Sequence, residues 1–343
     1  MSSNARYPAQ GVLGPIPSDE LRITSVHEHL IATQLNWFIA DSPVAGELGD
    51  EPVTLQNVGR IRRDPLCNRQ NLVLDDLEEA IGELSEFKVS GGSTIVDLTN
   101  DGFGRDPESL HAVAERTNVN IIMGSGYYVA DTHPPNMSIR SVEDCAQEII
   151  DDIRVGVKDT GVRAGIIGEI GCSDGIHPDE EKALRAAAMA QRETGAPIAI
   201  HQPIPLSRGG RPAPGREALR ILDILESEGT DLEHVLMCHM DHSLHDSGYH
   251  KAVANRGCML AFDRFGNEWY YDSLGQWYEW RDTERVEAIR WLIDHGHEDQ
   301  VTAGQDICYR ICLLRYGGWG YGHLLRNVIA MFEKTGIDQG LRR

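Results

Sequence analysis

Eight short apolar runs alternate with amphipathic stretches along this chain, and this alternation most constrains the fold. The runs predicted as β-strands are 23–30, 93–99, 120–126, 164–171, 197–201, 234–239, 258–262 and 301–306. Near-continuous apolar runs are typical of strands that are buried on both faces of a parallel sheet. Parallel neighbours need long crossover connections, which are usually helices. The pattern therefore predicts repeated strand–helix units.

The stretches between the runs carry helix signals. Residues 74–91 have apolar side chains three and four apart and end at Gly. Residues 141–161 open with a Ser cap and an acidic first turn. Residues 177–197 have Pro near the start and Gly after an Ala-rich body. Residues 282–296 show a comparable helix pattern that ends at Gly. Each stretch is predicted to be a helix.

Six imidazole and carboxylate side chains stand in or at the end of these runs: His27, His29, Glu169, His201, His239 and Asp306. Burying a polar group without a partner costs free energy, so a shared cation explains the set better than six separately packed residues. His27 and His29 are two apart, which puts both on one face of a strand, where they can chelate one ion. His295 and His297 have the same spacing but follow a helix, and we expect them at the surface.

The candidate ligands come from the first, fourth, fifth, sixth and eighth predicted strands. A closed barrel brings the carboxyl ends of all these strands around one point, whereas a doubly wound open sheet does not. The predicted fold class is therefore α/β, a (β/α)8 TIM barrel. We expect residues 1–343 to form a single domain, with the barrel core at about 20–335, since such barrels commonly exceed 250 residues.

Three connections are longer than a barrel requires, at 31–74, 263–281 and 307–322, and all leave carboxyl ends of strands. We expect them to hang over the same mouth. The stretch 262–280 gathers aromatic side chains, which favours a lid that packs on itself or on a partner subunit, or a wall for an acyl or aryl group. The Pro/Gly-rich segment 203–215 is predicted to be the loop after the fifth strand.

Composition excludes some functions. The chain has 32 basic and 53 acidic residues and a net charge of −21, which argues against a nucleic-acid partner. Seven dispersed Cys residues without a C-x-x-C pair argue against a thiolate zinc site or a disulfide framework, and Cys172, Cys238 and Cys258 are expected to be buried thiols. No long apolar segment or secretory h-region is present, so we expect a cytoplasmic protein without a membrane partner.

Nitrogen and oxygen ligands suit Zn, Mn, Co or Fe(II) better than Ca or Mg. We expect two divalent ions, with zinc preferred. Two ions a few Å apart can hold a bridging hydroxide, because coordination lowers the pKa of water from about 15.7 towards 7. Such a hydroxide could attack a small-molecule substrate.

The strings "GPIPSDELRITSVHEHL", "GEIGCS" and "GQDI" complete the pattern. With the spaced H-x-H, carboxylate, His, His and Asp, they resemble the phosphotriesterase family of the amidohydrolase superfamily, and its phosphotriesterase-related branch in particular. The resemblance spans roughly residues 11 to 335 and implies a binuclear metallohydrolase on a (β/α)8 barrel. It implies that His27, His29 and Asp306 hold a buried ion, that His201 and His239 hold a more exposed one, and that Glu169 bridges them. It also makes a homodimer plausible.

Departures from the family pattern bear on the substrate. Many members bridge the ions with a carboxylated Lys, but this chain has Glu169, and His242 stands where organophosphate-degrading relatives carry Asp. Arg264 and Tyr128 resemble pocket residues of lactonase relatives, and Arg264 could steady a leaving carboxylate or a carbonyl oxygen. Asp306 is expected to accept the proton during attack.

We rank a carboxylic ester or lactone first as substrate, an amide of a small acid second and a phosphotriester third. A metal-containing ligand-binding protein without activity and a structural barrel with a single zinc are the alternatives of other classes.

Overall fold

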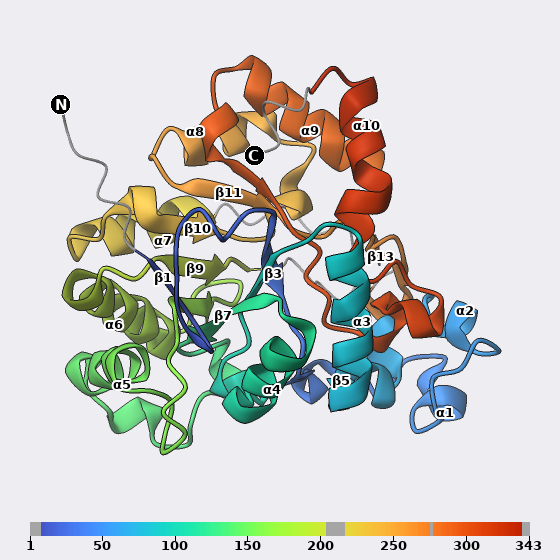
Figure 1. The fold of residues 1–343 in the computed structure, drawn as a ribbon, viewed down its shortest axis with the longest axis horizontal. Coiled ribbons are helices and arrows are strands. Elements are labelled where there is room, and N and C mark those ends of the chain that lie inside the picture. The colour runs from blue at the N-terminus through green and yellow to red at the C-terminus, as the bar shows by residue number, and fades with distance from the viewer. Residues whose placement is uncertain (1–7, 204–216, 275–276, 338–343) are drawn as a thin grey trace.

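The computed structural model describes residues 8–203, 217–274 and 277–337. Its core is an eight-stranded sheet in the order β14–β11–β10–β9–β8–β7–β6–β3, and every neighbouring pair is parallel. The two outer strands of this order meet, because Asp306 N donates to His27 O at 3.0 Å just past β14. The sheet thus curls into a nearly closed barrel wrapped by helices, as Figure 1 shows, and the predicted TIM barrel is confirmed. The open-sheet alternative is wrong.

All eight predicted strands are present, with ends that differ by a few residues. They are β3 (Thr24–Glu28), β6 (Thr94–Asp97), β7 (Asn120–Ser125), β8 (Ile166–Gly171), β9 (Ile198–His201), β10 (Val235–Met237), β11 (Met259–Phe262) and β14 (Val301–Ala303). Every residue of β6, β8 and β9 is buried. Burial on both faces is the physical reason for the near-continuous apolar runs.

The four predicted helices form where their caps lie: α3 (Leu77–Val89), α5 (Val142–Arg154), α6 (Pro178–Thr194) and α9 (Asp282–Asp294). Ser141 accepts from Asp144 N, and the Asp144 side chain accepts from Ser141 N, so α5 opens with a capping box. Gly195 ends α6 in the left-handed conformation, at φ +74°. The other helices are α1 (Ala45–Leu48), α2 (Val58–Ile61), α4 (Pro107–Thr117), α7 (Glu217–Ser227), α8 (Ser247–Ala254) and α10 (Ile329–Lys334), the last preceded by a π-turn at Leu324–Val328.

A short hairpin that the periodicity did not predict lies against the barrel. It pairs β1 (Ala9–Gly11) with β2 (Gly14–Ile16) in antiparallel register. Val12 N donates to Ile121 O at 2.9 Å, so the turn of the hairpin is tied to the start of β7. Two strands of three residues are too short to produce a readable alternation of apolar and polar side chains, and only contact with the barrel reveals them.

The three long connections carry their own small elements. The first pairs β4 (Ala32–Thr33) with β5 (Val73–Leu74), and the second pairs β12 (Tyr270–Tyr271) with β13 (Trp277–Tyr278). The first and second also touch, since Tyr270 N donates to Arg62 O at 3.1 Å. The predicted loop 203–215 lies almost wholly outside the described residues.

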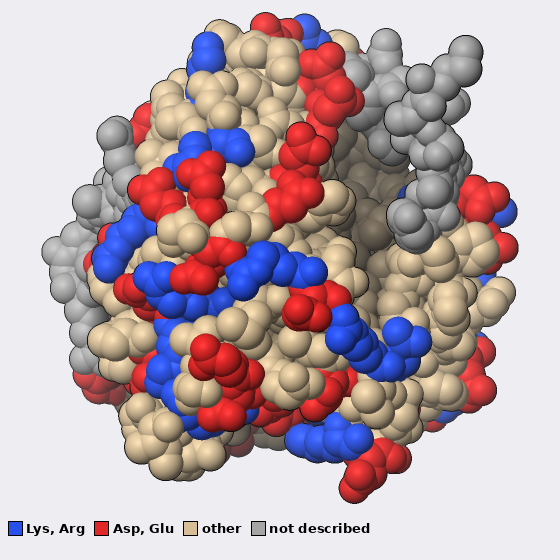
Figure 2. Space-filling model, turned by 90° about the vertical axis from the view of Figure 1, so that its left-hand side faces the viewer, with Lys and Arg blue, Asp and Glu red and all other residues tan. Residues whose placement is uncertain are grey.

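The surface is charged but mixed in sign. Figure 2 shows acidic and basic side chains interspersed over one face. Ion pairs such as Arg154–Glu193 between α5 and α6 join neighbouring elements in this way. All seven Cys residues are buried free thiols, as expected for Cys172, Cys238 and Cys258. Among the described helices, none has both the length and the apolar character that crossing a bilayer requires.

Candidate metal centre

The six candidate ligands converge at the carboxyl ends of their strands. His27 and Glu169 lie in β3 and β8, and His201 is the last residue of β9. His29, His239 and Asp306 stand shortly after β3, β10 and β14. All six are buried, the most exposed being Asp306 at 5%. Side chains far apart in sequence therefore meet in one place.

Glu169 stands at the centre of this cluster. Its carboxylate oxygens lie 3.5 Å from His27 Nε2, 3.8 Å from His29 Nε2, 3.2 Å from His201 Nδ1 and 3.6 Å from His239 Nε2. Two triads close enough to hold an ion, His27–His29–Glu169 and Glu169–His201–His239, share this one carboxylate. A carboxylate has two oxygens, so it can serve both triads at once.

Asp306 lies beside the histidines of the first triad as a further candidate ligand. Its Oδ1 lies 3.2 Å from His29 Nε2 and 3.7 Å from His27 Nε2. The other oxygen, Oδ2, accepts from Arg264 Nη1. One carboxylate oxygen thus faces the candidate metal position and the other faces the substrate side.

The histidines themselves show that a cation fits here. His27 Nε2 and His29 Nε2 are buried and have no hydrogen-bond partner in the part of the chain that the structure describes. Their opposite nitrogens are held, His27 Nδ1 by Asp263 at 2.7 Å and His29 Nδ1 by Thr99 Oγ1 at 2.9 Å. Metal-binding histidines are oriented in this way, with one nitrogen donating to a neighbour and the other directed at the ion. The donor set and its geometry fit a divalent transition metal.

Asp263 orients one histidine from each triad. Its Oδ2 accepts from His27 Nδ1, and its Oδ1 lies 2.9 Å from His239 Nδ1 and 3.0 Å from His239 N. Asp241 in turn accepts from Asp263 N at 2.8 Å and from Arg285 Nε at 2.8 Å. Asp263 therefore orients the two histidines, and Asp241 holds Asp263 in place.

Two candidate ligands hold an uncommon backbone conformation. His239 and Asp306 have φ of +60° and +47°, values that side-chain-bearing residues rarely adopt. Hydrogen bonds hold both: His239 N donates to Asp263, and Asp306 N donates to His27 O. Such strain persists where the surroundings enforce it, and functional sites are the usual place.

Glu28 is a positioning residue that sequence reasoning missed. It sits between His27 and His29, yet its carboxylate accepts from Ser25 Oγ at 2.6 Å and from the backbone N–H groups of Gln305 and Ile307 at 3.1 and 3.0 Å. It therefore clamps the residues on both sides of Asp306 to β3. Burial raises the pKa of Glu28 to about 8. The signal in the sequence was a charged residue within an apolar run that the H-x-H motif did not need.

A glycine makes room for Glu169. Gly168 has φ of +129°, and a Cβ there would lie 2.4 Å from Ala199 O on the neighbouring β9. No larger residue fits between these two strands.

The buried carboxylates of the cluster need positive charge close to them. Burial opposes ionisation of Glu169 and Asp263, yet the surrounding imidazoles hold the pKa of each carboxyl well below its usual range. Burial likewise lowers the pKa of His239, but Asp263 and Glu169 raise it well above its usual value. Divalent ions can supply the positive charge that the carboxylates otherwise draw from protonated histidines.

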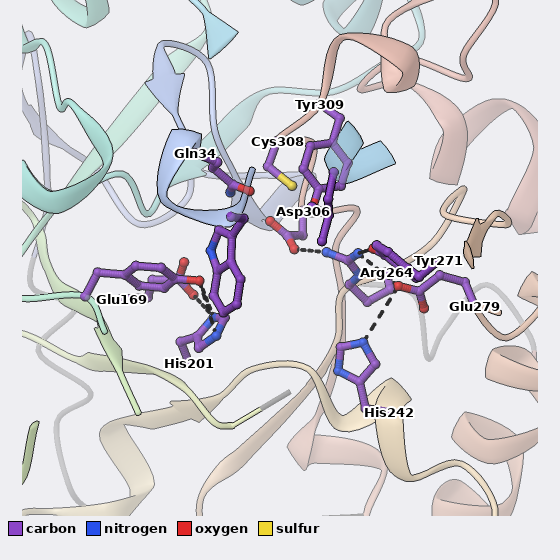
Figure 3. Close-up of a pocket in the computed structure, with 13 residues that line it drawn as sticks. Gln34, Glu169, His201, His242, Arg264, Tyr271, Glu279, Asp306, Cys308 and Tyr309 are labelled. Carbon is purple, nitrogen blue, oxygen red and sulfur yellow. Dashed lines mark hydrogen bonds and ion pairs between the residues drawn. The ribbon is translucent and has the colours of Figure 1, made fainter. Parts of the chain in front are cut away.

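A pocket opens beside the cluster, and all three long connections line it. Its described wall consists of Gln34, Trp37, Leu66, Tyr128, Glu169, His201, His242, Arg264, Tyr271, Glu279, Asp306, Cys308 and Tyr309. Figure 3 shows Arg264 between Asp306 and Glu279, on the side of the pocket opposite His201. The expectation that the long loops meet over one mouth is thus met.

The two predicted catalytic residues besides Asp306 both face this pocket. Tyr128 packs edge-on against His201, with ring centroids 4.7 Å apart and its OH 3.3 Å from His201 Nε2. Burial raises the pKa of Tyr128 well above its usual value, so it stays a neutral phenol that can donate a hydrogen bond. Arg264 Nη2 donates to Glu279 Oε1 at 3.0 Å and to Tyr271 OH at 3.3 Å.

The aromatic side chains of the stretch 262–280 differ in how deeply they are buried. Phe265, Trp269 and Tyr271 are buried, whereas Tyr270 and Tyr278 are 45% and 44% exposed. Tyr271 alone of the described aromatics in this stretch lines the pocket. The buried aromatic side chains pack mainly inside the protein, for example Trp269 against Tyr309, while the stretch supplies Arg264, Tyr271 and Glu279 to the pocket wall.

The other His pair is only partly as expected. His295 is exposed, but His297 is buried, with Nδ1 2.9 Å from Gln300 Oε1, so its placement at the surface is wrong. His297 stands directly before the turn Glu298–Gln300 that leads into β14. His133 Nε2 lies 2.7 Å from Tyr128 O, and His133 is absent from the described pocket wall.

Comparisons with known proteins show which family the chain belongs to. A model of the phosphotriesterase family matches residues 8–341. An N-acetyltaurine hydrolase from Xenopus tropicalis is 35% identical over 335 residues, which cover 96% of this chain and 93% of that protein. A phosphotriesterase-related protein from Nematostella vectensis is also 35% identical, over 340 residues with the same shares covered.

A solved structure shares the whole architecture. The crystal structure of a resiniferatoxin-binding protein from Rhodobacter sphaeroides superposes with a TM-score of 0.91 at 37% identity, covering 97% of this chain and 91% of that one. With a match over nearly its whole length and hydrolases among its relatives, the chain belongs to the phosphotriesterase family and is a metal-dependent hydrolase.

Proposed function

We propose that this protein hydrolyses a carboxylic ester or lactone with two divalent metal ions, zinc being preferred over Mn, Co or Fe(II). In this proposal His27, His29 and Asp306 bind one ion, His201 and His239 bind the other, and Glu169 bridges them. The observation that carries it is the pair of triads that share the Glu169 carboxylate beside a pocket.

When bound, the two ions would lower the pKa of a shared water and polarise the substrate oxygen. The residues of the chain supply the remaining functions. Asp263 fixes the rings of His27 and His239, so that both present Nε2 to the cluster. Glu28 fixes the backbone around Asp306. The site is thus set before substrate arrives, which is what electrostatic catalysis requires.

Asp306 is the proposed proton acceptor. Its Oδ1 faces the histidines and its Oδ2 faces Arg264, so a proton taken up from the attacking water can pass towards the pocket. Burial favours the neutral form of Asp306, but Arg264 and the nearby histidines outweigh burial and lower the pKa of Asp306, so the carboxylate is ionised before the reaction. Arg264 would steady the oxygen of the leaving group, and Tyr128 would donate a hydrogen bond beside His201.

Replacing Asp306 by Asn tests the proton role. Asn keeps the size and one oxygen ligand but cannot accept a proton at neutral pH, so we expect turnover of a lactone or aryl ester to fall about 10²–10⁴-fold. Metal content, measured by elemental analysis on the same preparations, should fall far less. Turnover that stays within a few fold of the wild type would remove Asp306 from this role.

An amide of a small acid is the second candidate substrate. It is favoured by the 35% identity to a protein named N-acetyltaurine hydrolase, over nearly the whole of both chains. A phosphotriester is third. Steady-state rates with a matched lactone, N-acetyl amide and aryl phosphotriester, measured on the zinc-loaded enzyme, would rank the three. The expected homodimer, the cytoplasmic location and the single-domain organisation of residues 1–343 are proposals that rest on the sequence.

A further inference from the structure

Glu279 is the one carboxylate in the described pocket wall that is not a candidate metal ligand. It follows β13 in the second long connection and is only 3% exposed. Its Oε1 lies 3.0 Å from Arg264 Nη2 and 3.8 Å from His242 Nε2, and its Oε2 lies 3.5 Å from Arg285 Nη2. The lid thus places a buried negative charge directly against the pocket arginine, as Figure 3 shows.

The positive charges around Glu279 are already balanced. Arg264 is the one Lys or Arg side chain among the described residues of the pocket wall, and its outer nitrogens donate to Asp306 and Glu279. Arg285 lies deeper, at 0% exposure, and contacts Asp241 at 2.8 Å and Asp282 at 3.1 Å. The described side chains of the wall therefore offer a substrate no positive charge that is not already paired with a carboxylate.

Glu279 is ionised under ordinary conditions. Burial favours its neutral form, but Arg264 and His242 outweigh burial and hold the pKa of Glu279 at about 2. A substrate sulfonate or carboxylate would have to displace this carboxylate from Arg264 to be gripped by the guanidinium. Displacement would break the shortest ion pair of Glu279 and leave this buried carboxylate only its longer contacts to Arg285 and His242, which is unfavourable.

We propose that Glu279 is a specificity-determining residue that makes this pocket prefer uncharged substrates to substrates with an anionic headgroup. The inference rests on the proposed function and narrows its substrate class to uncharged esters and lactones. A pocket that binds a free sulfonate would instead need a cationic side chain that is not already paired with a carboxylate.

Two acetate esters of similar size and shape, one anionic and one uncharged, test the preference. One is 3-acetoxypropane-1-sulfonate, and the other is the uncharged 3-(methylsulfonyl)propyl acetate. We expect the wild-type, zinc-loaded enzyme to show a kcat/KM at least tenfold higher for the uncharged ester. A wild-type preference for the sulfonate would overturn the proposal without any variant.

Three variants assign the preference to Glu279. Glu279→Gln removes the charge and keeps the shape, so the ratio of the two kcat/KM values should fall at least tenfold, mainly through a lower KM for the sulfonate. Glu279→Asp keeps the charge and should retain the preference. Glu287→Gln, at an exposed position on α9, removes the same net charge and should change nothing. An unchanged ratio in a folded, metal-loaded Glu279→Gln variant would contradict the assignment.

Binding separates this inference from the proposed reaction. The corresponding methyl ethers, 3-methoxypropane-1-sulfonate and 3-(methylsulfonyl)propyl methyl ether, have no acyl group to cleave. Calorimetry should give the uncharged ether at least tenfold tighter binding to the wild type, and Glu279→Gln should remove this difference. If neither ester is hydrolysed, the proposed ester cleavage is wrong. If the wild type binds the two ethers equally well, the proposed preference for uncharged substrates is wrong.

Discussion

Asp263 connects the two halves of the candidate metal centre through a single carboxylate. It accepts from one histidine of each triad, and it lies at 0% exposure directly after β11. Replacing it by Asn would remove a charge that both imidazoles contact and would place a competing N–H donor beside one of them. Changes to such supporting residues usually weaken metal affinity 10–100-fold.

We therefore expect Asp263→Asn to lose affinity for both ions and not for one alone. Competitive titration with a fluorescent zinc chelator should show both dissociation constants raised by about 10–100-fold. Asp159→Asn, at an exposed position, removes a similar charge and serves as the control. If only one ion binds more weakly and the other binds as tightly as before, Asp263 supports only one of the two metal sites.

At the scale of the element, α8 carries a buried histidine whose protonation is linked to stability. His250 is 1% exposed, and its Nε2 lies 3.0 Å from Met240 O and 2.9 Å from Ser243 Oγ, in the segment that follows His239. Burial lowers the pKa of His250 to about 4 from a usual value of 6.5. The unfolded chain therefore binds more protons than the folded one between these two values.

Stability from this residue is fully present above pH 6.5 and is lost as the pH falls towards 4, because protonation favours the unfolded state. Between pH 7 and pH 5 the loss from His250 is about 2 kcal/mol. Urea unfolding of the wild type and of His250→Gln should show a smaller decrease over this range in the variant. His111→Gln, a half-exposed position on α4, is the control and should keep the wild-type decrease. Equal decreases in the wild type and His250→Gln would contradict the linkage.

The elements also show where periodicity is informative. Buried strands such as β8 and β9 and well-capped helices such as α5 and α6 were predictable, because their signals lie within a few neighbouring residues. The hairpin β1–β2 and the pair β12–β13 were not, because strands of two or three residues owe their conformation to the surfaces on which they pack.

At the scale of the whole molecule, metal binding should be linked to folding, because the candidate ligands come from five strands of the barrel. Two of these strands, β3 and β14, are the ones that meet where the barrel closes. An ion held by residues of distant strands stabilises only the folded barrel. For each site, ligand at 100 times its dissociation constant contributes about 2.7 kcal/mol.

Exhaustive dialysis against a chelator should therefore lower the thermal midpoint by several degrees, and added zinc should restore it. Differential scanning calorimetry before dialysis, after dialysis and after zinc addition measures both changes. Adding Mg instead is the control, since nitrogen-rich ligand sets bind it poorly. A midpoint that is the same with and without bound zinc would mean that the cluster does not hold ions in the folded state.

The amino-acid sequence by itself determined the barrel, its eight strands, the four well-capped helices and the identity of the six candidate ligands. Each of these depends on local periodicity or on polar residues placed where apolar runs end, and both are visible in one dimension. Tertiary structure alone decided how the ligands are supported. Glu28 turns away from its two histidine neighbours to clamp Asp306, Asp263 joins two triads, and Glu279 reaches the pocket from a lid. These contacts join residues that are up to 279 positions apart, and such pairings form only when the closed barrel brings the strand ends together.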